Sequence, residues 1–338
     1  MERFRDKFGA GILGKGNPYE GGLEQGIAYD LYEINHPIVQ QNIGNPKILF
    51  GYQYTALDLL KHFSTLHNSN LLEIGCGTGI GTLEMLLQNP TSKVLCVEDS
   101  EGMINIAKYK FHQIAESSIL NQTTDKKLLR YWQEFRSKSK PFKDKVEFIK
   151  SKFEDTSLKP NSIDYAIAFS SFYHTDLYKS FKKLKTYLKD GKCILWDGSS
   201  HFYDDKEFPS NIYGFRYHKI LDYILKEVSK KVKVIGDYKD LSRPKYSLDE
   251  IKQISLKEGF ITEKIAVYLS PVDLQVFIKN FVPYIIRKLV SPEIEDREFN
   301  FILKESLGNV ISNPKALEDN THKYGIKAVF RSTKINFK

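Results

Sequence analysis

The chain of 338 residues carries a formal net charge of +8, with 41% hydrophobic and 27% charged residues. This composition is typical of a globular protein, and no apolar run approaches the roughly 20 residues that a membrane-spanning helix needs. The N-terminal residues are charged and lack the apolar stretch of a secretory signal, so we expect a cytoplasmic protein. The three cysteines form no C-x-x-C pair and have no histidine at ligand spacing, so the sequence predicts neither a disulfide framework nor a metal site.

The basic excess is compatible with three kinds of partner: nucleic acid, an anionic metabolite or a membrane surface. Lysines gather in residues 125–145 and 226–240. Acidic residues and apolar residues at helical spacing interrupt both stretches, which favours solvated helix faces over a nucleic-acid groove. Nucleic acid is therefore the less favoured partner.

The first seventy residues show no alternation of strands and helices and are rich in aromatic residues and glycine. Two interpretations stay open, a cap laid over a binding site and a packed N-terminal extension. We place the boundary of this segment at residues 1–51. Tyr29 and Tyr32 are its candidate contacts to a substrate.

From residue 70 onward, β-rich runs alternate with helical patterns, as in a mostly parallel sheet covered by helices on both faces. We expect a Rossmann-like α/β fold. The predicted strands cover residues 70–75, 93–98, 146–150, 163–169 and 192–197. The predicted helices cover residues 82–88, 101–115, 177–189 and 247–260, the last beginning with a Ser-x-x-Glu capping box.

Two later runs, 261–269 and 327–335, are expected to close the sheet as an antiparallel pair. The insertion between them carries apolar residues spaced as on one helix face, namely Leu274, Phe277, Phe281 and Ile285, with Pro283 expected to kink or interrupt that helix. This face serves either as core or as the roof of an apolar pocket, and we expect mixed use. After the cap, the predicted units are a core at 52–270, a helical insertion at 271–322 and a final core strand at 323–338.

The stretch "LLEIGCGTGIG", residues 71–81, is a strand that feeds a glycine-rich turn and then a helix. Such a turn directs backbone N–H groups and the positive end of the helix toward a ligand. The dinucleotide fingerprint G-x-G-x-x-G fails here because the third glycine falls on Ile80 or Thr82, and no G-K-[ST] completes a P-loop. What remains is E-x-G-x-G-x-G from Glu73 to Gly79, which resembles motif I of the class I S-adenosylmethionine-dependent methyltransferases.

This resemblance implies S-adenosyl-L-methionine as cofactor and S-adenosyl-L-homocysteine as product. It implies that Glu73 meets the ammonium group of the cofactor and that the loop passes beneath its amino-acid and ribose parts. The loop positions concerned are Gly75, Cys76, Gly77 and Gly79. At the end of the next strand, Glu98 is expected to accept the ribose hydroxyls, with Asp99 as a second candidate and Met103 in the register of the family pattern.

After the third strand the chain departs from the family, because Lys152 stands where a carboxylate is common. Phe153 is then the candidate to pack on the adenine ring. Glu154 or Asp155 would replace the missing acid.

The turn after the fourth strand is expected to lie near the transferred methyl group, with Ser170 on the cofactor and Phe172 on the acceptor. His174 is the candidate general base, and Tyr173 a weaker catalytic candidate. A histidine here that only hydrogen-bonds to neighbouring backbone is the alternative. Trp196, at the end of the fifth strand, either lines the pocket or caps the core.

Methyl transfer chiefly requires that a nucleophile be aligned with the S–CH3 bond and that water be excluded. No Asn/Asp-Pro-Pro-Tyr/Phe motif or cysteine follows the fourth strand, which argues against the amino-methylating and thiolate-using nucleic-acid enzymes. We therefore predict methylation of a small, aromatic or apolar metabolite. The alternatives are an RNA or protein methyltransferase and a catalytically silent cofactor-binding partner subunit.

Overall fold

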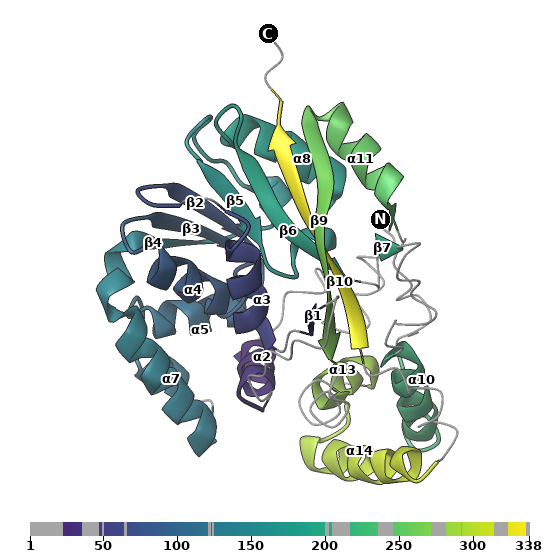
Figure 1. The fold of residues 1–338 in the computed structure, drawn as a ribbon. Helices are drawn as coiled ribbons and strands as arrows, with labels where there is room; N and C mark the ends of the chain where they lie inside the picture. The colour runs from purple at the N-terminus through teal and green to yellow at the C-terminus, as the bar shows by residue number, and fades with distance from the viewer. Residues whose placement is uncertain are drawn as a thin grey trace.

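The computed structural model describes residues 23–35, 47–48, 51–63, 66–120, 123, 125–199, 203–204, 217–235, 246–271, 282–291, 293–313 and 324–335. In these residues an eight-stranded sheet forms the centre of the molecule, and helices lie on both of its faces (Figure 1). A group of helices stands apart from the sheet, beyond one end of its long antiparallel strands.

The sheet has the strand order β1-β9-β10-β6-β5-β2-β3-β4. Its strands are β1 (Lys47–Ile48), β2 (Asn70–Ile74), β3 (Lys93–Glu98), β4 (Val146–Lys150), β5 (Tyr165–Ala168), β6 (Cys193–Ser199), β9 (Phe260–Pro271) and β10 (Tyr324–Lys334). Neighbours from β4 to β6 pair in parallel, whereas β10 is antiparallel to both β6 and β9. The predicted α/β fold with an antiparallel C-terminal strand pair is thereby confirmed. Two short strands, β7 (Tyr203–Asp204) and β8 (Tyr246–Ser247), pair separately.

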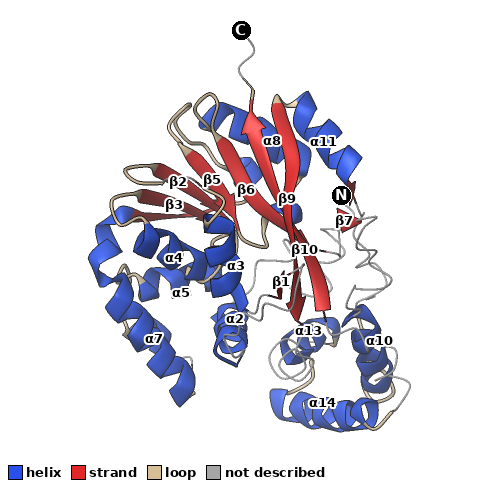
Figure 2. Ribbon diagram, in the orientation of Figure 1, coloured by secondary structure: helices blue, strands red, loops and turns tan. Residues whose placement is uncertain are grey.

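The helices lie on the two faces of this sheet or beyond one end of β9 and β10 (Figure 2). They are α2 (Leu23–Asn35), α3 (Gly51–Leu60), α4 (Ile80–Gln88), α5 (Glu101–Lys110), α6 (Ser117–Leu120), α7 (Lys126–Ser139), α8 (Leu177–Tyr187), α10 (Tyr217–Val228), α11 (Leu248–Lys257), α13 (Val282–Leu289) and α14 (Asp296–Ile311). Helices α3, α4 and α5 share one apolar cluster with the sheet, and α8 and α11 share another. Three short 3₁₀ turns are η2 (Lys140–Lys145), η3 (Phe153–Asp155) and η4 (Phe172–His174).

The two apolar clusters follow from the alternation of side chains along each strand. Leu71 belongs to the α4 side and Leu72 to the α8 side, and the same division separates Leu195 from Trp196. Because successive strand residues point to opposite faces, a strand covered on both faces must be apolar at consecutive positions. This explains why the strands read as short continuous apolar runs.

Capping residues fix where the predicted helices begin. The Ser247 hydroxyl accepts from the backbone N–H of Glu250, and the Glu250 carboxylate accepts from the backbone N–H of Ser247, so the predicted capping box is confirmed. The Ser100 hydroxyl caps α5 by accepting from the N–H of Met103. Helix α11 ends next to Gly259, whose φ of +84° stops helical propagation.

The helices α10, α13 and α14 pack on one another through an apolar cluster of their own. Its fully buried members include Leu221, Ile224, Ile286 and Leu289. The sequence placed α10 in the core unit 52–270, whereas its packing joins it to the predicted insertion. Helix α13 begins at Val282, so Pro283 lies in its first turn, where no N–H is required. Leu274, Phe277 and Phe281 lie outside the described residues.

Helix α2 lies across α5 and α7. Its apolar residues contact Ile106, Tyr109 and Trp132. The contact is close, because a Cβ added at Gly26 would lie 2.6 Å from Cδ1 of Ile106. Part of the aromatic-rich N-terminal segment is therefore a helix packed on the α5 side of the sheet. Among the helices of the described ranges, none has the length and apolar character needed to cross a membrane.

Candidate cofactor and acceptor site

The glycine loop joins β2 to α4 and uses a backbone conformation that other residues avoid. The φ angles are +70° at Gly75, +55° at Gly77 and +84° at Gly79, which is also the N-cap residue of α4. A residue with a side chain in the left-handed region costs roughly 1–2 kcal/mol. The three alternate positions of this loop are thus glycines because each of them adopts a left-handed backbone conformation.

The three glycines differ in what surrounds them. A Cβ at Gly75 would lie 2.4 Å from Cβ of Ser171, and one at Gly79 would lie 3.1 Å from the Phe111 ring. At Gly77 the nearest atom is Sδ of Met103, 3.8 Å away. Gly75 and Gly79 are thus enclosed by the protein, whereas Gly77 leaves room beside the loop.

Glu98 ends β3 directly beside this loop. Its carboxylate accepts from the N–H of Gly77 at 2.8 Å and, through the other oxygen, from the N–H of Ser100 at 2.9 Å. Burial raises the pKa of Glu98, and the hydrogen bonds from Ser100 and Gly77 lower it. Asp99 also hydrogen-bonds to this carboxylate, and the acceptance of ribose hydroxyls by Glu98 stays a prediction. The loop and the acid that the sequence predicted as cofactor contacts therefore meet in one place.

Glu73 has a different environment from the one that the resemblance implies. Its side chain is 1% exposed, and its carboxyl accepts from the Thr82 hydroxyl at 2.5 Å and from the Cys96 thiol at 3.7 Å. Burial raises the pKa of Glu73 to about 8. A neutral carboxyl held against the first turn of α4 supports the loop from behind, and its contact to the ammonium group stays a prediction.

The turn after β5 contains a second strained position. Ser170 has a φ of +54°, and both its N–H and its hydroxyl donate to the carboxylate of Asp197, at 2.5 and 3.0 Å. Asp197 is fully buried at the carboxyl end of β6. A buried acid in one strand thus fixes the turn that follows its neighbour, a role that differs from the two that the sequence left open for this strand end.

His174 and Tyr173 lie together in η4, with ring centroids 4.2 Å apart. Both side chains are partly exposed, and the backbone N–H of His174 donates to the carbonyl of Ser171 at 2.8 Å. The side chain on the preceding residue, Phe172, is fully buried. The catalytic roles of His174 and Tyr173 stay predictions. Both residues directly follow the turn that Asp197 holds at Ser170.

Phe172, which the sequence placed on the acceptor, and Trp196, for which the sequence left pocket and core open, both lie in the core. Both are 0% exposed, with their ring centroids 5.2 Å apart, and the indole N–H of Trp196 donates to the Ser332 hydroxyl at 3.1 Å. The reason is strand alternation, because Trp196 follows Leu195 and therefore points to the α8 face of the sheet. In this structure the pair contributes no surface to a pocket.

The other predicted contacts are placed as follows. Phe153 is 3% exposed and packs edge-on against Tyr187, and the Glu154 carboxylate accepts from the N–H of Asp176 at 2.7 Å. Cys76 and Met103 are buried beside the loop, and Asp99 adjoins Glu98. Tyr29 is partly buried on α2. The side chains of Tyr32, Phe277 and Phe281 lie outside the described part of the chain. The adenine and acceptor contacts thus stay predictions.

A protein family described as "Methyltransferase domain" matches residues 72–195 of this chain. The matched stretch contains the glycine loop, Glu98 and the turn with His174. The parallel sheet and its loop define a ligand-binding α/β unit of the kind that holds its ligand at the carboxyl ends of the strands. Residues 72–195 are similar to a methyltransferase domain, which supports the predicted resemblance and the S-adenosylmethionine cofactor that it implies.

A curated relative is a bifunctional methyltransferase from Rickettsia prowazekii, 25% identical over 243 residues. The match covers 65% of this chain and 45% of the relative, so the chain spans about half the length of that protein.

Solved structures with a similar arrangement include two methyltransferases. The phosphoethanolamine N-methyltransferase 2 of Haemonchus contortus, in complex with S-adenosyl-L-methionine, is 17% identical with a TM-score of 0.46, and the match covers 98% of this chain and 60% of that one. A putative sarcosine dimethylglycine methyltransferase from Galdieria sulphuraria is 14% identical with a TM-score of 0.46, covering 84% and 85%.

Proposed function

We propose that the protein transfers the methyl group of S-adenosylmethionine to a small, aromatic or apolar metabolite by in-line displacement. The observation that carries the proposal is the hydrogen bond between the N–H of Gly77 and the carboxylate of Glu98, at a loop residue where an added Cβ would meet no atom closer than 3.8 Å. This arrangement suits a ligand that offers hydroxyl groups to the acid and lies along the loop.

The acceptor class is supported by the N-terminal segment. The Thr78 hydroxyl, in the middle of the glycine loop, donates to Asp30 of α2 at 2.6 Å. A helix from outside the matched domain therefore lies against the loop that binds the cofactor. We expect this helix to help enclose the bound ligands, and an enclosed site suits a small acceptor better than a macromolecular one, because a small acceptor can be surrounded while water is excluded.

Bound S-adenosylmethionine supplies an electrophilic methyl group on a sulfonium. The residues of this chain provide position and a proton acceptor. Glu98 and the loop hold the ligand, while Asp197 fixes the turn at Ser170 and so places His174 beyond the end of β5. For a hydroxyl acceptor, His174 would take the proton that the acceptor loses on methylation, and for an ammonium acceptor it would first remove the proton that blocks the nitrogen lone pair.

The first test is calorimetric titration of the purified protein with S-adenosylmethionine, S-adenosylhomocysteine and, as a control ligand, NAD. We expect the first two to bind and NAD not to bind. Glu98→Gln, which removes the charge that accepts the hydroxyls, should weaken binding by about 10- to 100-fold. Glu147→Gln, on the exposed face of β4, is the matched control and should bind normally. Equal affinity of both variants would place the cofactor elsewhere.

The acceptor is then identified by measuring consumption of the methyl donor with metabolite pools and, separately, with RNA and protein fractions. Turnover with the metabolite pools supports the proposal. Turnover only with RNA or protein favours a macromolecular acceptor. Cofactor binding without turnover in any pool indicates a silent cofactor-binding subunit.

A further inference from the structure

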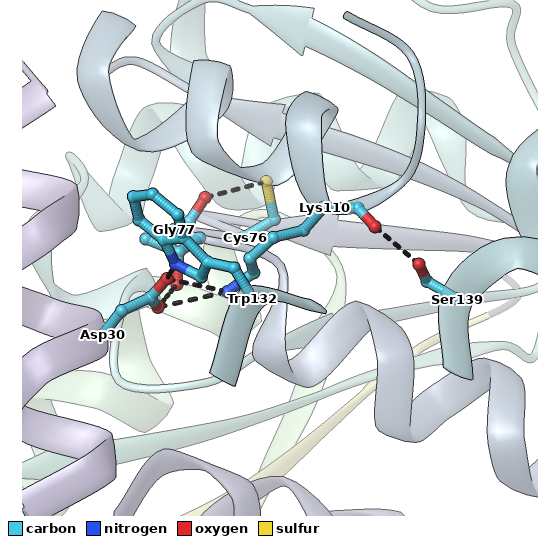
Figure 3. Close-up of polar contacts among 7 residues, drawn as sticks. Asp30, Cys76, Gly77, Lys110, Trp132 and Ser139 are labelled. Atoms are coloured by element: carbon cyan, nitrogen blue, oxygen red, sulfur yellow. Dashed lines mark hydrogen bonds and ion pairs between the residues drawn. The ribbon is translucent and has the colours of Figure 1, made fainter. Parts of the chain in front are cut away.

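A buried polar cluster joins α2 to the glycine loop, to α5 and to α7 (Figure 3). At its centre is Asp30, which is 0% exposed. One carboxylate oxygen accepts from the Thr78 hydroxyl at 2.6 Å and from Lys110 Nζ at 3.1 Å. The other accepts from Lys110 Nζ at 3.0 Å and from the indole N–H of Trp132 at 2.6 Å. One carboxylate from the N-terminal segment therefore binds donors from three separate elements.

The ion pair at the centre of this cluster is fully removed from water. Lys110 is 0% exposed, and its Nζ lies 4.2 Å from the centroid of the Phe135 ring and 5.3 Å from that of Tyr131. Burial of two charges carries a desolvation cost that their attraction only partly offsets, so apolar residues of similar volume often give equal or greater stability. A buried ion pair of this kind is better explained by the orientation that it imposes than by stability.

The residue that the cluster orients is Thr78. It lies between Gly77, whose N–H donates to Glu98, and Gly79, which caps α4. The backbone of the loop is otherwise held by the N–H of Gly75 on the carbonyl of Val97 and that of Gly79 on the carbonyl of Cys76, at 2.7 and 2.9 Å. The hydroxyl of Thr78 adds a tether on the opposite side, toward α2.

Helix α2 packs closely on α5, so it can serve as the fixed partner of the hydrogen bond from Thr78. Its Gly26 permits close contact with α5, since a Cβ there would lie 2.6 Å from Ile106 and 3.3 Å from the carbonyl of Gly102. On the far side of the cluster, the Ser139 hydroxyl of α7 donates to the carbonyl of Lys110 at 2.5 Å. Helices α2, α5 and α7 thus form one packed group, and the Thr78 hydroxyl joins the loop to its α2 member by a hydrogen bond.

We propose that Asp30 is a positioning residue for the cofactor site, which holds the glycine loop in its binding conformation through Thr78 and so couples the docking of α2 to cofactor binding. The proposal rests on the proposed function in that the loop binds S-adenosylmethionine. Coupling of this kind is reciprocal, so cofactor binding must also stabilise the docked position of α2.

The test uses Thr78→Val in the full chain, because Asp30→Asn would leave Lys110 buried without its charged partner and endanger folding. Valine keeps the branched shape of threonine and replaces the hydroxyl by a methyl group, which cannot donate to Asp30. Titration with S-adenosylhomocysteine should show about tenfold or greater loss of affinity. Thr78→Ser, which restores the hydroxyl, should recover it. Thr186→Val, the same change on the exposed face of α8, is the matched control and should bind as the wild type does.

Hydrogen exchange supplies a second readout that a merely structural role would not change. In the wild type, S-adenosylhomocysteine should slow amide exchange in α2, residues 23–35. In Thr78→Val this protection should be lost, and the amides of residues 75–79 should exchange faster in the free protein. A purely structural role predicts instead a lower melting temperature with unchanged affinity and retained protection, which would overturn the proposal.

The outcomes also separate this inference from the proposed function. A wild-type protein that binds no S-adenosylhomocysteine contradicts the proposed function, and exchange at residues 75–79 still tests the tether in that case. A wild type that binds, with Thr78→Val binding equally well and showing wild-type exchange in the loop, overturns the inference alone.

Discussion

In the glycine loop the backbone itself is the functional group, whereas in the cluster of α10, α13 and α14 the side chains only fill space. Gly75, Gly77 and Gly79 each adopt a positive φ, and two of them have no room for a Cβ. In the helical cluster, buried residues such as Leu221 and Ile286 need only be apolar and of suitable size. The loop therefore identifies its ligand, while the cluster shows only that three helices pack together.

Gly75→Val should give the largest effect of the changes that test this difference. It combines a left-handed backbone for a β-branched residue with a contact at 2.4 Å to Ser171, at about 2–6 kcal/mol in total. Gly191 has a similar φ of +71° with no atom within 4 Å, so Gly191→Val carries only the strain of about 1–3 kcal/mol. Urea unfolding and cofactor titration measure both, and binding should be lost in the first alone. Equal costs at the two positions would contradict the close approach.

His174→Ala tests whether a side chain takes part in the reaction in addition to the backbone of the glycine loop. If His174 removes the acceptor's proton, kcat should fall about 100-fold while cofactor affinity stays unchanged. The partly exposed ring leaves no large cavity when it is removed. Activity should recover at high pH, where the acceptor loses its proton unaided. His67→Ala, at an exposed position, is the control. Full activity of His174→Ala across the pH range would leave the histidine with a structural role.

The parts of this molecule that sequence could predict are those set by neighbouring residues. Alternating apolar runs gave the strands, and the glycines of the loop and the capping box at Ser247 lie within a few residues of what they affect. Asp30 is separated by 48 residues from Thr78 and by 80 from Lys110, so no local pattern reveals their contact.

The lack of a local pattern also explains why the residues near the acceptor could not be predicted from the sequence. Trp196 reads as a candidate pocket residue at the end of a strand, and only its register in the folded sheet shows that it points into the core. The join between α10 and the later helices is likewise tertiary, because residues far apart in the chain share one apolar cluster. An acid at the end of the fifth strand was the one signal that could have indicated the role of Asp197.

Glu73→Gln tests the carboxyl that is buried directly behind the loop, through the pH dependence of the free energy of unfolding. The pKa of Glu73 is about 8 in the folded protein against 4.5 as the ordinary value. Between these values the folded state keeps a proton that the unfolded state has released, so this contribution to the free energy of unfolding falls as pH rises. Glutamine cannot titrate, and the variant should lose less stability than the wild type between pH 5 and 8.5 in urea unfolding, with Glu147→Gln as control. Parallel pH curves for Glu73→Gln and the wild type would contradict the burial of a titrating carboxyl.

Gly308→Ala should give the smallest effect, and one of the opposite sign to that of Gly75→Val. Gly308 lies in α14 with no atom within 4 Å of an added Cβ, and its φ is not positive. Alanine there lowers the entropy lost on folding and should stabilise the protein by about 0.5–1 kcal/mol, as urea unfolding would measure, with cofactor affinity unchanged. A loss of stability would mean that the helical cluster, like the loop, requires a bare backbone at this position. A gain would show that the helical cluster does not require glycine at this position, whereas the loop requires it at Gly75.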